Sequence, residues 1–253
     1  MTGRARGSQS SVFRVARTST AHLIAVELRK AIRSGALPVG AQIGEVEIAE
    51  QLGVSRGPLR EAAQRLVEEG VLTSVPGRGL RVTTIGPEEV ADVYEARLAV
   101  EGQAIRRIVR DERMSSVDAI ERAYEDLVRR SAGDDAIDAG NADLEFHQTL
   151  VDASGSPRLS RAMSTLALET RIAAFSAPDG YSVRREVSET YRSLIGALRD
   201  GDAERAVAAL EEQFREAVAR LRGEVEVETF EPADGDLPDA LTPIGSEELG
   251  TGE

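Results

Sequence analysis

The sequence contains no cysteine and only two histidines, His22 and His147, in 253 residues. The lack of cysteine excludes disulfides and thiolate metal sites, and two histidines leave little scope for metal or histidine-based chemistry. No apolar run approaches the roughly 20 residues that a membrane-spanning helix needs. The basic N-terminus is not followed by the apolar core of a secretory signal. We therefore expect a cytoplasmic protein without membrane contact.

Aromatic residues are also scarce, at 4% of the chain, whereas Leu, Ala, Val, Ile and Arg dominate. This composition is typical of a mainly helical protein. The length suits one large domain or two small ones with a substantial core. The composition therefore predicts a mainly α fold.

The net charge of −13 is unevenly distributed along the chain. Residues 1–85 carry a net charge of +5, residues 86–222 carry −8, and residues 223–253 carry −10 without a basic side chain. A cationic N-terminal segment on an acidic body is expected of a domain that binds a polyanion. An excess of +5 is modest, however, and charge alone leaves open a simple preference for arginine.

The first 85 residues have the pattern of a winged helix-turn-helix. A basic arm over 1–17, expected to be disordered, precedes a first helix, and the stretch PVGAQI is expected to form a turn. A short second helix, with its apolar residues including Val46 facing inward, ends at Gly53. A third helix capped by Ser55 leads into two β-type runs joined by PGRG, a hairpin tip that needs glycine. We assign residues 18–85 to a DNA-binding domain.

Gly86 and Pro87 interrupt this pattern and mark the expected domain boundary. Residues 86–222 have helical periodicity and predict an all-α antiparallel bundle. Helices are expected at 88–110, 115–131, 137–154, 157–176, 183–200 and 203–222. Residues 223–253 are acidic and rich in glycine and proline, so we expect a disordered tail.

The stretch GVSRGPLREA, residues 53–62, contains most of the expected DNA contacts. In a winged helix-turn-helix the helix that starts here lies in the major groove, and its N-terminal residues reach the bases. Arginine can hold a guanine edge or a phosphate with two hydrogen bonds. The expected contact residues are Ser55, Arg56, Gly57 and Arg60, with Gly77 and Arg78 at the hairpin tip. The alternative is that Ser55 only caps the helix and the arginines are surface charges.

The segment SGALPVGAQIGEVEIAEQLGVSRGPLREAAQRLVEEGVLTSVPGRGLRV resembles the DNA-binding domain of GntR-family transcriptional regulators, over about residues 20–83. The resemblance implies DNA contacts by Ser55, Arg56, Arg60 and the wing glycine, Gly77. Family members often carry a further arginine or lysine near the second helix that touches phosphate. Here that helix begins Glu-Val-Glu at residues 45–47, which puts this contact in question.

Three stretches after Gly86 resemble the FCD-type effector domain of the FadR-like branch: VYEARLAVEGQAI, ADLEFHQTLVDASGSPRL and RSLIGALRDGDAERAVAALEEQF. Many FCD domains hold a divalent metal with one aspartate and three histidines. Asp143 and His147 match the first two ligands, but the other two positions hold Tyr191 and Gln213, which are poor ligands for such a metal. We therefore expect no metal and no other cofactor.

We expect instead a polar effector cavity lined by Asp143, His147, Tyr191 and Gln213. Arg97 is a candidate to bind an anionic group of the effector, although a salt bridge with Glu101, four residues on, is an equal alternative. For Asp143 and His147 the alternative is a structural hydrogen bond within a buried helix.

These features predict a ligand-responsive transcriptional regulator, and more specifically a repressor, that binds an inverted-repeat operator as a homodimer. Its effector is expected to be a small organic acid or a similar polar metabolite. Two alternatives stay open: a helical-domain enzyme that uses Asp143 and His147, and an architectural DNA-binding protein without an effector. Against an enzyme, the chain has no cysteine, no second histidine near the site and no glycine-rich phosphate loop.

Overall fold

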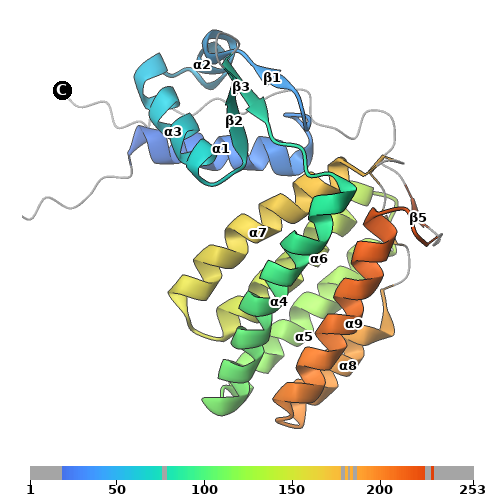
Figure 1. The fold of residues 1–253 in the computed structure, drawn as a ribbon. Helices are drawn as coiled ribbons and strands as arrows, with labels where there is room; N and C mark the ends of the chain where they lie inside the picture. The colour runs from blue at the N-terminus through green and yellow to red at the C-terminus, as the bar shows by residue number, and fades with distance from the viewer. Residues whose placement is uncertain are drawn as a thin grey trace, which may run out of the picture.

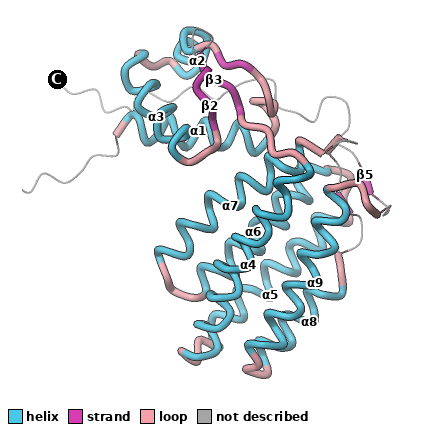
Figure 2. The backbone as a smooth tube through the Cα atoms, viewed as in Figure 1, coloured by secondary structure: helices cyan, strands magenta, loops and turns pink. Residues whose placement is uncertain are grey.

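The computed structural model describes residues 19–75, 79–177, 180–181, 183–184, 187–225 and 229–230. A small winged unit, residues 19–85, lies at one end of a bundle of long helices that begins at Pro87 (Figure 1). Among these residues, strand occurs in the winged unit and in one short pair beside the bundle (Figure 2). The predicted mainly helical fold with a small β wing is confirmed. None of the helices traced in these ranges has the length and apolar character that a bilayer crossing requires.

Helix α1 (Thr20–Ser34) opens the winged unit. Its N-cap is Ser19, whose side chain accepts a hydrogen bond from the backbone N–H of His22 at 3.2 Å. It ends at Gly35, whose φ of 83° lies in the left-handed region that favours glycine. Helices α2 (Glu45–Leu52) and α3 (Arg56–Glu68) follow, and α3 packs against both α1 and α2.

The wing is an antiparallel hairpin of β2 (Leu72–Val75) and β3 (Gly79–Val82). A third strand, β1 (Gln42–Ile43), pairs with the other edge of β3, so that β3 lies in the middle of the sheet. The sequence predicted only a turn here. Two residues are too few to show the alternation of apolar and polar side chains that identifies a strand.

One inward position predicted for α2 is wrong. Val46 is 53% exposed, whereas Ile48, Ala49 and Leu52 are buried. Successive residues are separated by about 100° around a helix, so residues 48, 49 and 52 share one face and Val46 falls beside it. In a helix this short, one apolar side chain outside the face is enough to blur the pattern.

The bundle is organised around α4 (Pro87–Arg110), which packs against α6 (Ala136–Ala153), α7 (Pro157–Phe175) and α9 (Ala203–Leu221). Helix α4 begins directly after Gly86, whose N–H donates to the Glu89 side chain at 3.0 Å. Pro87 occupies the first turn, where its missing N–H has no consequence. Helix α5 (Met114–Ser131) lies against α6, and α8 (Glu189–Arg199) lies against α5 and α9.

The helix expected over 183–200 is shorter than predicted. Helix α8 begins at Glu189 because Ser188 caps it, its Oγ accepting a hydrogen bond from the N–H of Thr190 at 3.4 Å. Ahead of it, β4 (Val183–Arg184) pairs antiparallel with β5 (Thr229–Phe230). Strand β5 falls inside the segment expected to be disordered, so that expectation does not hold for these two residues. The predicted basic arm and residues 231–253 lie outside the described ranges.

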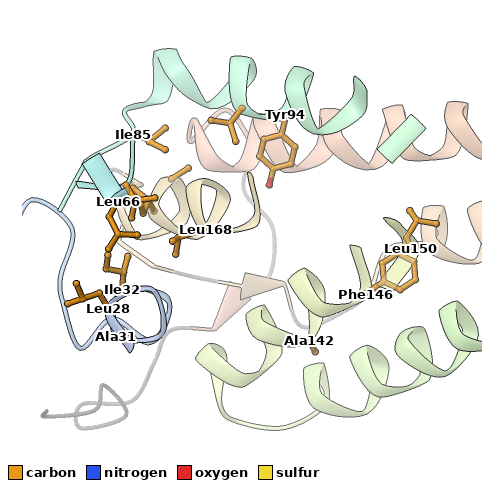
Figure 3. Close-up of a cluster of buried hydrophobic side chains, with 14 of the residues drawn as sticks. Leu28, Ala31, Ile32, Leu66, Ile85, Tyr94, Ala142, Phe146, Leu150 and Leu168 are labelled. Carbon is orange, nitrogen blue, oxygen red and sulfur yellow. The ribbon is translucent and has the colours of Figure 1, made fainter. Parts of the chain in front are cut away.

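The winged unit and the bundle share one hydrophobic core (Figure 3). Leu28 and Ile32 of α1 and Leu66 of α3 belong to the same buried cluster as Leu168 of α7 and Ile85 in the connection between the units. The N–H of Ile85 also donates to the side chain of Ser176, just after α7, at 3.3 Å. Burial of apolar surface therefore fixes the winged unit against α7.

Candidate DNA-binding face and effector cavity

The predicted DNA-binding face lies at the start of α3. Gly53 ends α2 at φ 67°, in the left-handed region that favours glycine, and turns the chain toward α3. Ser55 is the N-cap of α3 by backbone geometry, but its side chain makes no capping hydrogen bond. The exposed hydroxyl is therefore placed at a helix N-terminus, where phosphate groups bind favourably.

Arg56 and Arg60 lie on the same exposed face, and both point toward Glu45 at the start of α2. Nε of Arg60 is 2.7 Å from Oε2 of Glu45, and Nη2 of Arg56 is 3.9 Å from the same oxygen. The two arginine side chains are 57% and 59% exposed. Exposed ion pairs contribute only about 0–1 kcal/mol, so a DNA phosphate or base can replace Glu45 at little cost.

The remaining predicted DNA contacts are glycines and the wing tip. Gly57 is exposed, and a Cβ added to it would meet no protein atom within 4 Å. This open space permits close approach of another molecule to the α3 backbone. Gly77 and Arg78 lie outside the described residues. The exposed Val46 supplies no charge at the start of α2, where the family resemblance suggested an additional cation.

The five residues predicted for the effector site surround one cavity of about 100 Å³ in the bundle. Four helices, α4, α6, α8 and α9, contribute them. The predicted residues in its wall are Arg97, Asp143, His147, Tyr191 and Gln213; Tyr94, Ser131, Phe214, Glu216 and Arg220 also line it. The structure thus brings together residues that lie far apart in the sequence.

Arg97 forms the salt bridge that was the alternative to effector binding. Its Nε is 2.9 Å from Oε1 of Glu101, and the two side chains are only 1% and 0% exposed. The guanidinium also lies between two rings, 5.0 Å from the centroid of Tyr94 and 4.5 Å from that of Phe214. Burial raises the pKa of Glu101, but attraction to His147 and Arg97 outweighs it and holds the pKa below its usual range. Glu101 is therefore ionised at neutral pH.

His147 links Glu101 to Gln213. Its Nδ1 is 2.6 Å from Oε2 of Glu101, and its Nε2 is 3.0 Å from the side-chain nitrogen of Gln213. A neutral imidazole that donates from Nδ1 to the carboxylate and accepts the amide N–H at Nε2 satisfies both contacts. The imidazole N–H at Nδ1 is used by Glu101, so Nε2 is the acceptor and the amide nitrogen of Gln213 faces it. The Nε2 lone pair is therefore not available to another ligand.

Asp143 is held by Tyr191 rather than by His147. The Tyr191 hydroxyl donates to Oδ1 of Asp143, whereas Nε2 of His147 is 3.8 Å from that oxygen, too far for a hydrogen bond. The direct Asp143–His147 hydrogen bond considered from the sequence is therefore not formed. Burial and the adjacent Asp143 raise the pKa of the Tyr191 phenol well above its usual value, so it stays protonated.

These contacts do not fit the divalent metal of many FCD domains. His147 has no free nitrogen lone pair, Tyr191 is a protonated phenol, and Gln213 offers only an amide. Only Asp143 remains as a good ligand, where three or four protein ligands are usual. In the part of the chain that the structure describes, no group of three or more histidine, cysteine, aspartate or glutamate side chains is placed to hold a metal ion.

Sequence reasoning treated Glu101 only as a partner for Arg97 and missed the aromatic residues around it. Tyr94, Arg97 and Glu101 follow one another at intervals of three and four residues on α4, so they lie on one face. That spacing is visible in the sequence. What the sequence does not show is that this face meets His147 of α6 and Phe214 of α9.

Comparison with known proteins places both units in one family. Residues 20–82 match the model of bacterial regulatory proteins of the gntR family, and residues 92–226 match that of the FCD domain. The probable D-xylose utilization operon transcriptional repressor of Paenarthrobacter nicotinovorans is 30% identical over 197 residues, covering 78% of this chain and 86% of that protein. The gluconate operon transcriptional repressor of Bacillus subtilis is 29% identical over 139 residues, covering 55% and 57%.

Solved structures support the same fold. Escherichia coli McbR/YncC superposes with a TM-score of 0.70 at 24% identity, covering 81% of this chain and 98% of that one. A putative GntR transcriptional regulator from Rhodococcus sp. RHA1 superposes with a TM-score of 0.60 at 26% identity, covering 81% and 99%. The family and these relatives are transcriptional regulators rather than enzymes. The chain thus belongs to the GntR family of bacterial transcriptional regulators, with an FCD domain as its C-terminal part.

Proposed function

We propose that this regulator is a repressor that binds an inverted-repeat operator as a homodimer and responds to a small molecule in its helical domain. The observation that carries the DNA-binding part is the exposed face of α3, where Ser55, Arg56 and Arg60 stand at the helix N-terminus and Glu45 is the carboxylate that pairs with both arginines. A symmetric dimer presents two such helices, which favours a palindromic operator. Because it must reach chromosomal DNA, we place it in the cytoplasm.

The effector part of the proposal depends on how the cavity connects to the winged unit. Nη1 of Arg97, in the cavity wall, is 3.5 Å from Oγ1 of Thr170 on α7. Two residues before Thr170, Leu168 packs in the core shared with α1 and α3. A ligand that binds one arrangement of the cavity better than another therefore biases the position of α7 and of the DNA-binding face. Relatives named as operon repressors support the sign of regulation.

The decisive experiment is a gel-shift and footprint on DNA upstream of the gene that encodes the protein. We expect protection of two half-sites about 34 Å apart along the DNA, or a multiple of that distance. Affinity should fall steeply with salt because arginine–phosphate contacts release counterions. Sedimentation of the free protein should show a dimer, and a metabolite extract should weaken the complex. An asymmetric footprint with a monomer in solution would contradict the dimer, and insensitivity to every extract would favour an architectural protein.

A further inference from the structure

Some buried polar atoms of the cavity wall make no hydrogen bond in the part of the chain that the structure describes. They include Nη2 of Arg97, a donor, and Oε1 of Gln213, an acceptor. Both residues are more than nine-tenths buried, at 1% and 6% exposure. Buried polar groups are almost always paired, so the cavity is suited to a molecule that accepts one hydrogen bond and donates another.

The charges around Arg97 disfavour an anion at its free nitrogen. Asp143 and Glu216 line the cavity together with Arg97 and Arg220, and Glu101 lies behind Arg97 as its ion partner. The charge of Arg97 is already matched by Glu101 at 2.9 Å. A second carboxylate at Nη2 of Arg97 would therefore meet a guanidinium whose charge is already neutralised.

Asp143 adds to this preference because its side chain is 37% exposed and lines the cavity. Its Oδ1 accepts the Tyr191 hydroxyl, but a carboxylate has room for several further hydrogen bonds. The groups open to a ligand therefore include acceptors at Asp143 and Gln213 and a donor at Arg97. A ligand hydroxyl fits this set because each hydroxyl both donates and accepts.

We propose that the cavity binds a small uncharged polyol rather than an organic acid. This inference rests on the proposed function, in that it names the ligand class of the same cavity, and it departs from the expectation drawn from the sequence. A cavity of 150 Å³ holds benzene, so one of about 100 Å³ suits a polyol of roughly three or four carbons. One hydroxyl accepts from Arg97 Nη2, and another donates to Gln213 Oε1 or to Asp143.

Matched pairs of probes test the proposal by calorimetry and thermal shift: glycerol against glycerate, and erythritol against erythronate. Each acid differs from its polyol only by a terminal carboxylate. We expect the polyol of at least one pair to raise the melting temperature and to bind at least about tenfold more tightly than its acid, the factor associated with one mispaired buried polar group. Equal or tighter binding of the acids would overturn the proposal, as would binding of neither class.

Two variants test the proposal independently, so that it can still be tested if one of them folds poorly. Gln213→Leu removes the free acceptor and should weaken polyol binding about tenfold. Asp143→Asn keeps the Tyr191 hydrogen bond but removes the negative charge, so it should reduce the preference for polyol over acid. Glu212→Gln, an exposed neighbour on α9, serves as the control and should change neither value. An unchanged preference in Asp143→Asn would show that charge does not select the ligand.

Gel-shifts with the same probes separate this inference from the proposed function. If an acid binds in the cavity and releases operator DNA, the regulator senses a small molecule and only the ligand class is wrong. If the polyol binds in the cavity without any effect on the DNA complex, the ligand class stands and the proposed response to it is wrong.

Discussion

Two arginine–glutamate pairs of nearly equal length behave very differently in this protein. Nε of Arg60 is 2.7 Å from Glu45 on the proposed DNA-binding face, and Nε of Arg97 is 2.9 Å from Glu101 in the bundle. The first arginine is 59% exposed and the second 1%. Water solvates Arg60 and Glu45 when they separate, so another anion can replace Glu45 at little cost. Breaking the Arg97–Glu101 pair leaves an unpaired charge in the protein interior, which cannot solvate it. Burial, not distance, decides which pair can be exchanged for a ligand.

The largest expected effect comes from breaking the buried pair. Glu101→Ala leaves the Arg97 charge uncompensated and removes the partner of His147 Nδ1, so we expect a loss of about 3–5 kcal/mol in the free energy of unfolding. Urea denaturation measures it. The double variant Arg97→Met, Glu101→Leu removes both charges and should recover much of that loss. A double variant as unstable as the single one would show that packing, rather than charge, dominates here.

A smaller loss is expected at the core shared by the two units. Leu168→Ala should destabilise the protein by about 2–3 kcal/mol, the lower part of the range for buried leucines. The loss is at the lower end because side chains at the junction of the two units can move to fill part of the void that the missing side chain leaves. The loss should be accompanied by a weaker effect of ligand on DNA binding. Leu150→Ala, buried in α6, is the matched control and should lower stability while leaving that effect intact. Equal effects of both variants on the ligand response would contradict a role for α7.

The exposed arginine should affect DNA binding and not folding. Arg60→Ala should cost about 1–3 kcal/mol in operator affinity if Arg60 contacts a base, with less than about 1 kcal/mol lost in the free energy of unfolding. Fluorescence anisotropy with labelled operator measures the first quantity. Arg65, farther along α3 and paired with Glu61, provides the control Arg65→Ala. Operator affinity unchanged by Arg60→Ala would leave Arg60 as a surface charge.

The smallest effect is expected for Glu45, the carboxylate that pairs with Arg56 and Arg60. Glu45→Gln should change the free energy of unfolding by only about 0–1 kcal/mol. Without a competing anion, Arg56 and Arg60 should bind phosphate more readily, so affinity for random DNA should rise more than affinity for the operator. Competition gel-shifts measure the ratio of the affinity for the operator to the affinity for random DNA. A fall in both affinities would mean that Glu45 positions Arg60 for DNA instead of competing with it.

The parts of the fold that local signals determine could be predicted from the sequence. Gly53 and Ser55 mark the turn and the start of α3 by their own backbone preferences, and the glycine–proline break at residue 86 precedes α4. The strands β1, β4 and β5 could not be predicted, because each is two residues long and exists only through a partner distant in sequence.

The proposed effector cavity shows the same limit. Asp143 and His147 are four residues apart, a spacing that places both on one face of α6, and the family resemblance linked them to the positions of Tyr191 and Gln213. The observed pairing differs from a direct Asp143–His147 hydrogen bond: His147 bonds Glu101, and Tyr191 bonds Asp143. This pairing depends on how α4, α6 and α8 are placed relative to one another. The relative placement of the helices is determined by packing across the whole core, and no local sequence pattern indicates it.

The apolar contact of α7 with the winged unit has a consequence for protein engineering. Chimeric regulators are usually imagined as interchangeable modules joined at the connection between domains. Here a cut at Gly86 would separate Leu28, Ile32 and Leu66 from the Leu168 surface against which they pack. A foreign DNA-binding module grafted onto this bundle would therefore have to carry a complementary apolar patch on its first and third helices. In a chimera without that match, ligand binding and DNA binding would be uncoupled, so the ligand would not regulate transcription.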